Sequence, residues 1–243
     1  MNIIDKCMKR LRRMSLFLIY TRPFYTLWFN FRYLPFSIAR KLPIIFFPHA
    51  FAKVEKGAKI IIGDEILNHK SSKVYIGEDV RDFAHFSEKT YLHIAGTIVF
   101  NGKMRILRGA FIDAWGTINF GDNVLICSLA RIRSYNNVVI GNHVRIAHES
   151  QIFDTNFHYV TDAETMEYRP MSKPVIIGDY VWVGNRSTIN TGGVVPSHTI
   201  VASNSLVNKD MSDIKPYTLI GGMPCKILKE GITRIWDGTV ETK

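Results

Sequence analysis

Cysteine is scarce in this chain of 243 residues, and the three that occur, Cys7, Cys127 and Cys225, stand far apart. The sequence holds no Cys-x-x-Cys pair, so it indicates neither a disulfide framework nor a zinc knuckle. Long hydrophobic runs are also missing. The longest run near the N-terminus, Leu16 to Tyr20, is too short for a membrane span and weak for a signal peptide. These absences predict a cytoplasmic protein in a reducing compartment.

Acidic residues are nearly absent from the first fifth of the chain. Residues 1–50 carry nine lysines and arginines against Asp5 alone, and they also carry eleven aromatic residues. Cations interleaved with aromatic rings suit the surface of an anionic membrane. We therefore expect peripheral contact with the inner membrane face through residues 1–50. A packing cap over the main domain is the alternative, and nucleic acid is not expected as a partner.

Aliphatic and aromatic residues recur at every sixth position over much of the chain. The steps are regular apart from two offsets of two residues and one interruption after Ile152. The positions are Phe100, Ile106, Ile112, Ile118, Phe120, Ile126, Ile132, Ile140, Ile146, Ile152, Ile177, Val183, Ile189, Val195, Val201 and Val207. A period of six fits neither an α-helix nor an alternating strand, and it indicates a repeat architecture.

This repeat predicts an all-β fold: a three-sided parallel β-helix with short strands as its sides and a corner every six residues. Each repeated side chain points inward, and the next residue is expected to be small because the chain bends there. Three sides make a coil of about eighteen residues. We expect the β-helix over 51–215, an N-terminal cap or membrane arm over 1–50, and a C-terminal segment over 216–243. A short helix across Lys226–Trp236 is expected to cover the exposed end of the column.

The repeat breaks at the stretch DTNFHYVTD, which begins at Asp154. Continued counting in sixes would place His158, Glu164 and Pro170 in the interior, and burying an unpaired glutamate is costly. The chain is therefore expected to leave the column near Asp154 and return near 174, as a long loop over 154–174. A histidine has an ordinary pKa near 6.5, which suits a general base. Asp154 and Asp162 are candidates to orient the His158 ring.

Several motifs resemble the hexapeptide-repeat O-acetyltransferases, a left-handed β-helix family that includes the galactoside, maltose and capsule or lipopolysaccharide sugar acetyltransferases. The matching pieces are IGNHVRI, DTNFH, KPVIIGDYVWVG, SLVNKD and GGMPCKILK, between 140 and 229. The resemblance implies a homotrimer with active sites between neighbouring chains. It also implies acetyl-CoA as the donor and a sugar hydroxyl of a surface glycan or its precursor as the acceptor. On this resemblance His158 is the catalytic base, and the acetyl group moves directly, without an acyl-enzyme.

The same resemblance assigns residues to the acetyl-CoA groove. Trp182 matches a family tryptophan near the acetyl end of the donor. Asn185 and Ser203 match positions along the pantetheine arm. The positions that match the nucleotide end and its phosphates are Asn208, Lys209, Lys226 and Lys229.

The sequence departs from the family pattern at two positions, and it leaves other functions to consider. The loop has Asn156 where the family often has aspartate, and Cys225 fills a small-residue position and is not expected to be a nucleophile. His148 lies in AHESQIF, which resembles a zinc-binding motif of the γ-class carbonic anhydrases. The second ligand position there is Phe153, so no metal site is expected. N-acetylation of an amino-sugar nucleotide and a non-catalytic trimeric scaffold remain the alternative functions.

Overall fold

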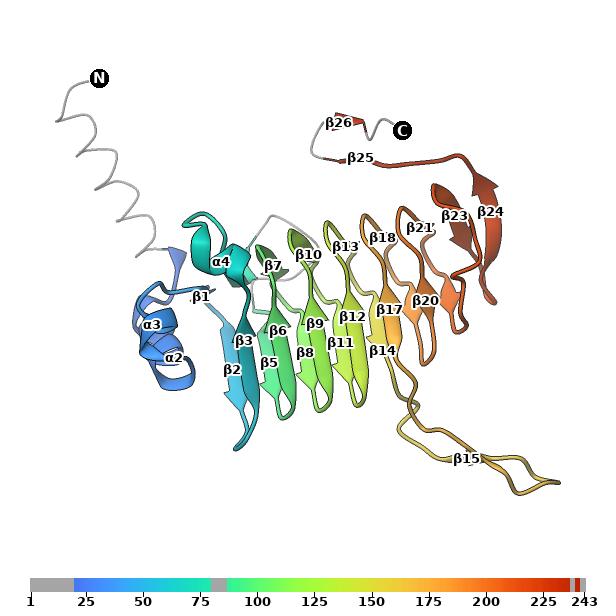
Figure 1. Ribbon diagram of the computed structural model, residues 1–243, viewed down its shortest axis with the longest axis horizontal. Coiled ribbons are helices and arrows are strands. Elements are labelled where there is room, and N and C mark those ends of the chain that lie inside the picture. The colour runs from blue at the N-terminus through green and yellow to red at the C-terminus, as the bar shows by residue number, and fades with distance from the viewer. Residues whose placement is uncertain (1–19, 80–86, 237–238, 241–243) are drawn as a thin grey trace.

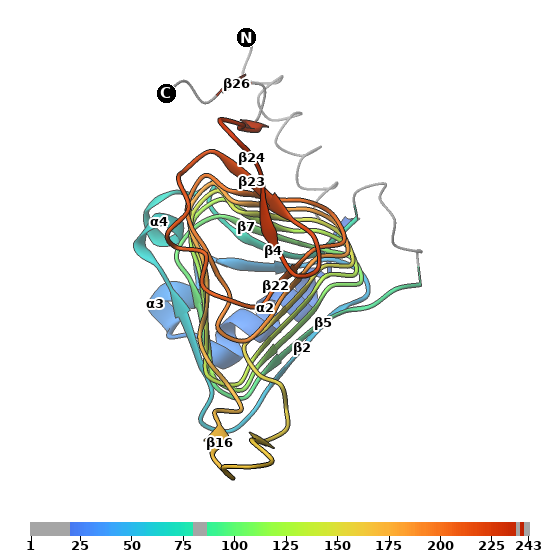
Figure 2. The same cartoon turned by 90° about the vertical axis from the view of Figure 1, so that its right-hand side faces the viewer.

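The computed structural model describes residues 20–79, 87–236 and 239–240. Its main body is a three-sided column of stacked parallel strands (Figure 1), seen along its axis in Figure 2. Sheet A, along the upper side in Figure 2, has nine strands. In spatial order they are β1 (Ile44–Phe46), β4 (Val74–Glu78), β7 (Met104–Leu107), β10 (Val124–Ile126), β13 (Arg145–Ile146), β18 (Trp182–Val183), β21 (Ile200–Val201), β23 (Thr218–Gly221) and β24 (Lys226–Glu230).

The other two sides of the column are sheets B and C, with seven and six strands. Sheet B runs β2 (Ala50–Val54), β5 (Thr90–Ile94), β8 (Phe111–Ala114), β11 (Arg131–Ser134), β14 (Gln151–Phe153), β19 (Thr188–Ile189) and β22 (Leu206–Val207). Sheet C runs β3 (Lys59–Ile62), β6 (Thr97–Phe100), β9 (Thr117–Phe120), β12 (Asn137–Ile140), β17 (Val175–Ile177) and β20 (Val194–Val195).

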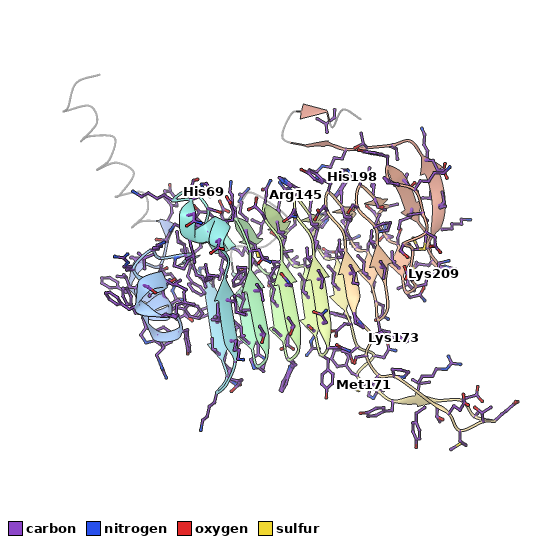
Figure 3. The ribbon with its side chains drawn as sticks, in the orientation of Figure 1. His69, Arg145, Met171, Lys173, His198 and Lys209 are labelled. Carbon is purple, nitrogen blue, oxygen red and sulfur yellow. The ribbon has the colours of Figure 1, made fainter. Side chains whose placement is uncertain are left out.

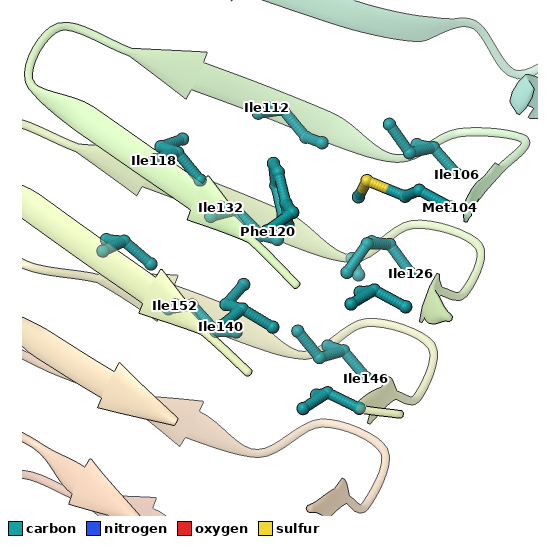
Figure 4. Close-up of a cluster of buried hydrophobic side chains, with 14 of the residues drawn as sticks. Met104, Ile106, Ile112, Ile118, Phe120, Ile126, Ile132, Ile140, Ile146 and Ile152 are labelled. Atoms are coloured by element: carbon teal, nitrogen blue, oxygen red, sulfur yellow. The ribbon is translucent and has the colours of Figure 1, made fainter. Parts of the chain in front are cut away.

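The residues of the sixfold repeat form the interior of the column, as predicted. All sixteen are at most 1% exposed. Equivalent positions stack in register through successive coils, for example Ile106 on Ile126 and Ile126 on Ile146 (Figure 4). Because this interior is dry and aliphatic, each coil buries its apolar side chains only against the coils above and below it.

The small residues that follow the repeat are required for a reason different from the predicted one. Gly121 and Gly184 are not in the left-handed backbone region. A Cβ at either position would lie 2.6 Å from the backbone of the next coil, so close coil-to-coil approach is what excludes larger residues. The bend itself comes at residues such as Asn123 and Arg186, whose φ angles of 52° and 57° are left-handed.

Helix α2 (Pro23–Tyr33) covers the open N-terminal end of the column. Strands β1 and β2 are the edges of sheets A and B, so one side of each has backbone groups without a strand partner. The Asn30 side chain bonds both backbone groups of Ile44. The Asn30 Oδ1 accepts from the Ile44 N–H at 3.2 Å, and the Asn30 Nδ2 donates to the Ile44 carbonyl at 2.7 Å. The Tyr25 hydroxyl pairs with the N–H and carbonyl of Ala52 in the same way. The helix thus satisfies polar backbone at two exposed edges.

The expectation of a C-terminal helix was wrong. Residues Lys226–Glu230 form β24, which pairs antiparallel with β23, and a short pair, β25 (Ile235–Trp236) with β26 (Thr239–Val240), follows. The last coil leaves the backbone of β23 without a neighbour on one side. Strand pairing satisfies those groups, whereas a helix packed there would not.

Two short helices complete the described structure, α3 (Phe36–Ala39) and α4 (Asp64–Asn68). No helix within the described residues has the length and apolar character needed to cross a membrane.

Candidate active site

The chain leaves the column between sheets B and C and forms a hairpin, here called the arm, over residues 155–172. Strands β15 (Val160–Thr161) and β16 (Tyr168–Arg169) pair antiparallel within it, and Thr155 pairs with Ser172 at its base. The arm projects away from the column in Figure 1 and lies beyond the lower corner in Figure 2. It returns to the coil at Val175, the first residue of β17.

His158 lies on the outgoing side of this arm and is exposed to solvent. No hydrogen bond or ion pair joins its ring to another residue of the described chain. The preceding residue is anchored: the Phe157 ring lies 6.4 Å from the Phe153 ring and 4.8 Å from the Arg133 guanidinium. The Thr155 hydroxyl accepts from the Phe157 N–H at 3.0 Å. The structure thus presents an imidazole on a fixed backbone, with its ring nitrogens available.

Asp154 is fully buried at the base of the arm. Its Oδ1 accepts from the Tyr135 N–H at 2.7 Å, and its Oδ2 accepts from the Asn136 N–H at 2.8 Å and the Ser134 hydroxyl at 3.0 Å. Both carboxylate oxygens are therefore occupied by the corner of the preceding coil. No hydrogen bond joins Asp154 or Asp162 to His158 among the described residues, so the orienting role of these carboxylates stays a prediction.

Asp154→Ala is expected to lower the free energy of unfolding by about 3 kcal/mol, because three donors, one buried and two partly buried, would lose a charged acceptor. Asp154→Asn is the matched control. It keeps the shape and one acceptor oxygen, and it is expected to cost roughly half as much. Urea titrations followed by circular dichroism, at one protein concentration, measure both. A loss below about 1 kcal/mol for the alanine variant would show that the arm's base does not depend on this carboxylate.

Sequence reasoning missed a chain of hydrogen-bonded side chains that supports the arm from sheet B. Asp113, only 3% exposed, accepts from the Arg133 Nε and Nη2 at 3.0 and 2.8 Å. The other side of this carboxylate meets the His93 Nδ1 at 2.8 Å. Arg133 is thereby held where its guanidinium packs on Phe157. The signal was present in the sequence: His93, Asp113 and Arg133 stand twenty residues apart, at equivalent positions in successive coils.

The predicted donor-groove residues lie on other parts of the column. Trp182 is in β18 of sheet A, and the Arg234 guanidinium lies 5.0 Å from its ring. Asn185 and Ser203 lie at the corner between sheets A and B in adjacent coils, where the Ser203 hydroxyl donates to the Asn185 Oδ1. The structure therefore brings Asn185 and Ser203 together on one corner, and Trp182 lies in the strand that leads into this corner, three residues before Asn185.

The predicted phosphate contacts lie near the C-terminal end of the column. Asn208 and Lys209 follow β22, and Lys226 and Lys229 lie in β24; all four side chains are exposed. Lys209 is close enough to Cys225 for its charge to act on the thiol. Burial nevertheless raises the pKa of Cys225, which is 1% exposed, so the thiolate is disfavoured.

His158 lies on a different edge of the column from Trp182, Asn185 and Ser203. Asn208 and Lys209 instead follow β22, at the edge between sheets B and C from which the arm also leaves. The arm leaves at the corner of sheets B and C, whereas Asn185 and Ser203 lie at the corner of sheets A and B. Figure 3 shows Met171, at the arm's base, on the side opposite to Arg145, the sheet A neighbour of Trp182. No hydrogen bond, ion pair or ring contact connects the arm to these groove residues in the described chain.

His148, the residue of the zinc alternative, is half-buried at the corner after β13, and its carbonyl accepts from the Arg186 N–H at 3.1 Å. Among the described residues no group of three or more histidine, cysteine, aspartate or glutamate side chains is arranged to hold a metal ion.

The sequence of the chain is similar to those of known acetyltransferases. No protein-family model matches the chain. WbbJ of Escherichia coli K12, named as a lipopolysaccharide biosynthesis O-acetyl transferase, is 30% identical over 159 residues, which are 60% of this chain and 80% of WbbJ. The galactoside O-acetyltransferase of the same strain is 25% identical over 64% of this chain and 63% of its own length.

Solved structures with a similar course include the polysialic acid acetyltransferase NeuO, at 22% identity and a TM-score of 0.45, covering 79% of this chain and 74% of NeuO. Another is the hexapeptide-repeat acetyltransferase VCA0836 of Vibrio cholerae in complex with acetyl-CoA. It is 30% identical, with a TM-score of 0.43, over 50% of this chain and 64% of VCA0836.

The extent of the match to WbbJ, together with the three-sided column, places the chain in a family. The chain belongs to the hexapeptide-repeat acyltransferases, the left-handed β-helix family, and within that family it is an acetyltransferase.

Proposed function

We propose that the protein transfers an acetyl group from acetyl-CoA to a sugar hydroxyl of a surface glycan or its precursor. The observation that carries this proposal is the arm: it presents His158, exposed and without a hydrogen-bond partner in the described chain, on a backbone anchored at Phe157 and Asp154. The names of the relatives support the acceptor class, since WbbJ is named for lipopolysaccharide biosynthesis and a second relative for galactosides.

His158 acts as the general base in this reaction. Its unprotonated ring nitrogen takes the proton from the sugar hydroxyl as the oxygen attacks the thioester carbonyl. The tetrahedral intermediate collapses, the carbon–sulfur bond breaks, and the imidazolium returns the proton to the departing thiolate of CoA. The products are an acetyl ester and free CoA, without an acyl-enzyme. Asp154 is a positioning residue, because its carboxylate fixes the base of the arm.

The complete site is proposed to form between neighbouring chains of a homotrimer. One chain carries His158 on a different corner from its own Asn185 and Ser203, so a second copy must bring those groups together. Closed rings of three use head-to-tail interfaces, in which two different surfaces of one chain meet. The arm of one chain would then reach the groove corner of the next.

Acetyl-CoA is proposed to lie along that groove corner. Asn185 and Ser203 would face the pantetheine arm, and Trp182 would lie near the acetyl end, where it lines the cleft. Asn208 with the exposed ammonium groups of Lys209, Lys226 and Lys229 would meet the nucleotide and its phosphates. A lipid-linked precursor as acceptor would place the reaction at the membrane surface, the setting that the basic N-terminal segment is expected to favour.

The proposed reaction is tested by incubating the purified protein with acetyl-CoA and lipopolysaccharide or capsule oligosaccharides. Free CoA is followed with a thiol reagent, and the acceptor by mass spectrometry. The expected result is acceptor-dependent release of CoA with one acetyl group gained. Mild alkali separates the two candidate reactions, since it removes an O-acetyl ester but leaves an N-acetyl amide. An alkali-stable product would assign N-acetylation, and release of CoA without acetylated sugar would overturn both.

A further inference from the structure

Helix α2 has a second face that capping the column does not explain. Its inward residues, such as Thr26 and Asn30, bond the edge strand β1. The opposite side carries Phe24, Leu27, Trp28 and Phe31, which are exposed and spaced three or four residues apart. Phe24 is 85% exposed. These four large apolar side chains contribute nothing to the hydrogen bonds that hold the helix on the column.

The apolar side of α2 continues onto α3. The Phe36 ring lies 6.0 Å from the Phe31 ring and is 74% exposed. We call Phe24, Leu27, Trp28, Phe31 and Phe36 the aromatic face. Cations flank it, since Arg32 lies on the same helix and Arg40 follows Phe36 by one helical turn, its N–H donating to the Phe36 carbonyl at 3.1 Å.

Arg40 also lines an open pocket of about 620 Å³, the basic pocket, together with three lysines, Asn68 and two apolar residues. The cations are Arg40, Lys41, Lys70 and Lys73, and the apolar residues are Ile66 and Leu67. No ion pair joins any of these four cations to a carboxylate of the described residues. The nearby Glu65 of α4 pairs instead with His69, at 3.4 Å.

Two of the lysines in the basic pocket are held in place. The Lys41 ammonium donates to the Leu67 carbonyl at 2.8 Å, and the Lys73 ammonium donates to the Lys41 carbonyl. Each ammonium has three donors, so both keep donors for a ligand. Partial burial, and the charge of Lys41, lower the pKa of Lys73. A bound anion would offset both effects, because it would neutralise the local excess of positive charge.

We propose that the N-terminal end of the column docks on an anionic membrane, with the aromatic face in the interfacial layer and a lipid headgroup phosphate in the basic pocket. Aromatic rings favour the headgroup region, and cations next to them meet its phosphates. Residues 1–19 of the basic segment lie outside the described residues, so the proposal depends on the aromatic face and the basic pocket alone. The half-buried Leu67 in the pocket suits the glycerol and first acyl carbons of a lipid. Docking is independent of the identity of the sugar acceptor.

Vesicle flotation of the full chain tests this docking. Vesicles of phosphatidylcholine alone are compared with vesicles that also contain phosphatidylglycerol, and wild type is expected to bind only the anionic ones. Arg40→Gln/Lys70→Gln is expected to weaken binding about 25-fold, at about fivefold for each cation near the surface. Phe24→Ser/Phe31→Ser is expected to weaken it about tenfold or more. All four side chains are exposed, so both variants should fold.

The matched control is Arg131→Gln/Arg169→Gln, which removes two exposed cations away from the helical end, on β11 and on the arm. It is expected to bind within about twofold of wild type. An equal loss of vesicle binding in the control and pocket variants would mean that net charge alone drives binding. The proposed role of the basic pocket would then be wrong. If the wild-type protein does not bind anionic vesicles but binds inorganic phosphate in calorimetry, the pocket is a site for a soluble phosphate compound. The docking proposal would then be wrong. His158→Ala is expected to bind vesicles like wild type. Vesicle binding therefore tests the docking proposal separately from the catalytic proposal.

Discussion

Replacing His158 by alanine is expected to lower kcat by about two to four orders of magnitude, the usual contribution of a general base. The KM for acetyl-CoA should change little, because the proposed contacts with the donor are made by groove residues such as Asn185 and Ser203, whereas the imidazole acts on the acceptor hydroxyl. The fold should be unaffected. His158 is exposed and bonds no described residue, so removing the ring leaves no buried group without a partner.

Steady-state kinetics with acetyl-CoA and an acceptor that the wild-type protein acetylates measure this loss. His69→Ala is the matched control, since it removes another exposed histidine, which follows α4 near the N-terminal end of the column. It is expected to keep wild-type turnover. Circular dichroism and thermal unfolding check that both variants are folded. If the turnover of His158→Ala is within about tenfold of wild type, His158 is not the general base.

Mixing two inactive variants is expected to restore about a quarter of wild-type activity. His158→Ala lacks the base, and Ser203→Trp fills the donor groove with an exposed, bulky ring. In a head-to-tail ring, a working site needs the arm of a Ser203→Trp chain against the groove of a His158→Ala chain. Random assembly of equal amounts gives that pairing at about one interface in four.

Co-expression of the two variants with different affinity tags, followed by purification through both, isolates the mixed trimers. Homotrimers are then excluded and one interface in three has the working pairing, so the purified mixed trimers are expected to show about a third of wild-type activity. Each variant alone, and a mixture of two differently tagged His158→Ala chains, should stay inactive. No recovery in mixed oligomers would mean that each site is built within one chain, and the shared-site proposal would be wrong.

The core of this protein was predictable because it depends on spacing alone. A residue such as Ile132 reaches the interior by its place in a sixfold count, and its neighbours Ile112 and Ile152 do so by the same count. The spacing of apolar residues along the chain was therefore enough to predict which side chains form the core. The reason given for the small corner residues was incomplete, because the approach of Gly121 to the next coil is a contact between coils that a single repeat does not reveal.

The ends and the site depended on tertiary contacts that the sequence pattern does not encode. Residues Lys226–Glu230 became a strand because β23 offers an unpaired edge. The DTNFH motif drew attention to Asp154, but its three hydrogen bonds to the preceding corner follow from the stacking of two coils. Arg133 was overlooked for the same reason, since its partner Asp113 is one coil and twenty residues away.

The number of coils between α2 and the arm has a consequence for acceptor choice. Sheet B has five strands from β2, beside the helix, to β14, where the arm leaves, and strands are about 4.8 Å apart, so this span is about 20 Å. With its helical end resting on lipid, the column would act as a ruler. It would hold the imidazole at a set height and favour hydroxyl groups on sugars that stand that far above the bilayer, so inserting or deleting a coil would shift the position that is modified.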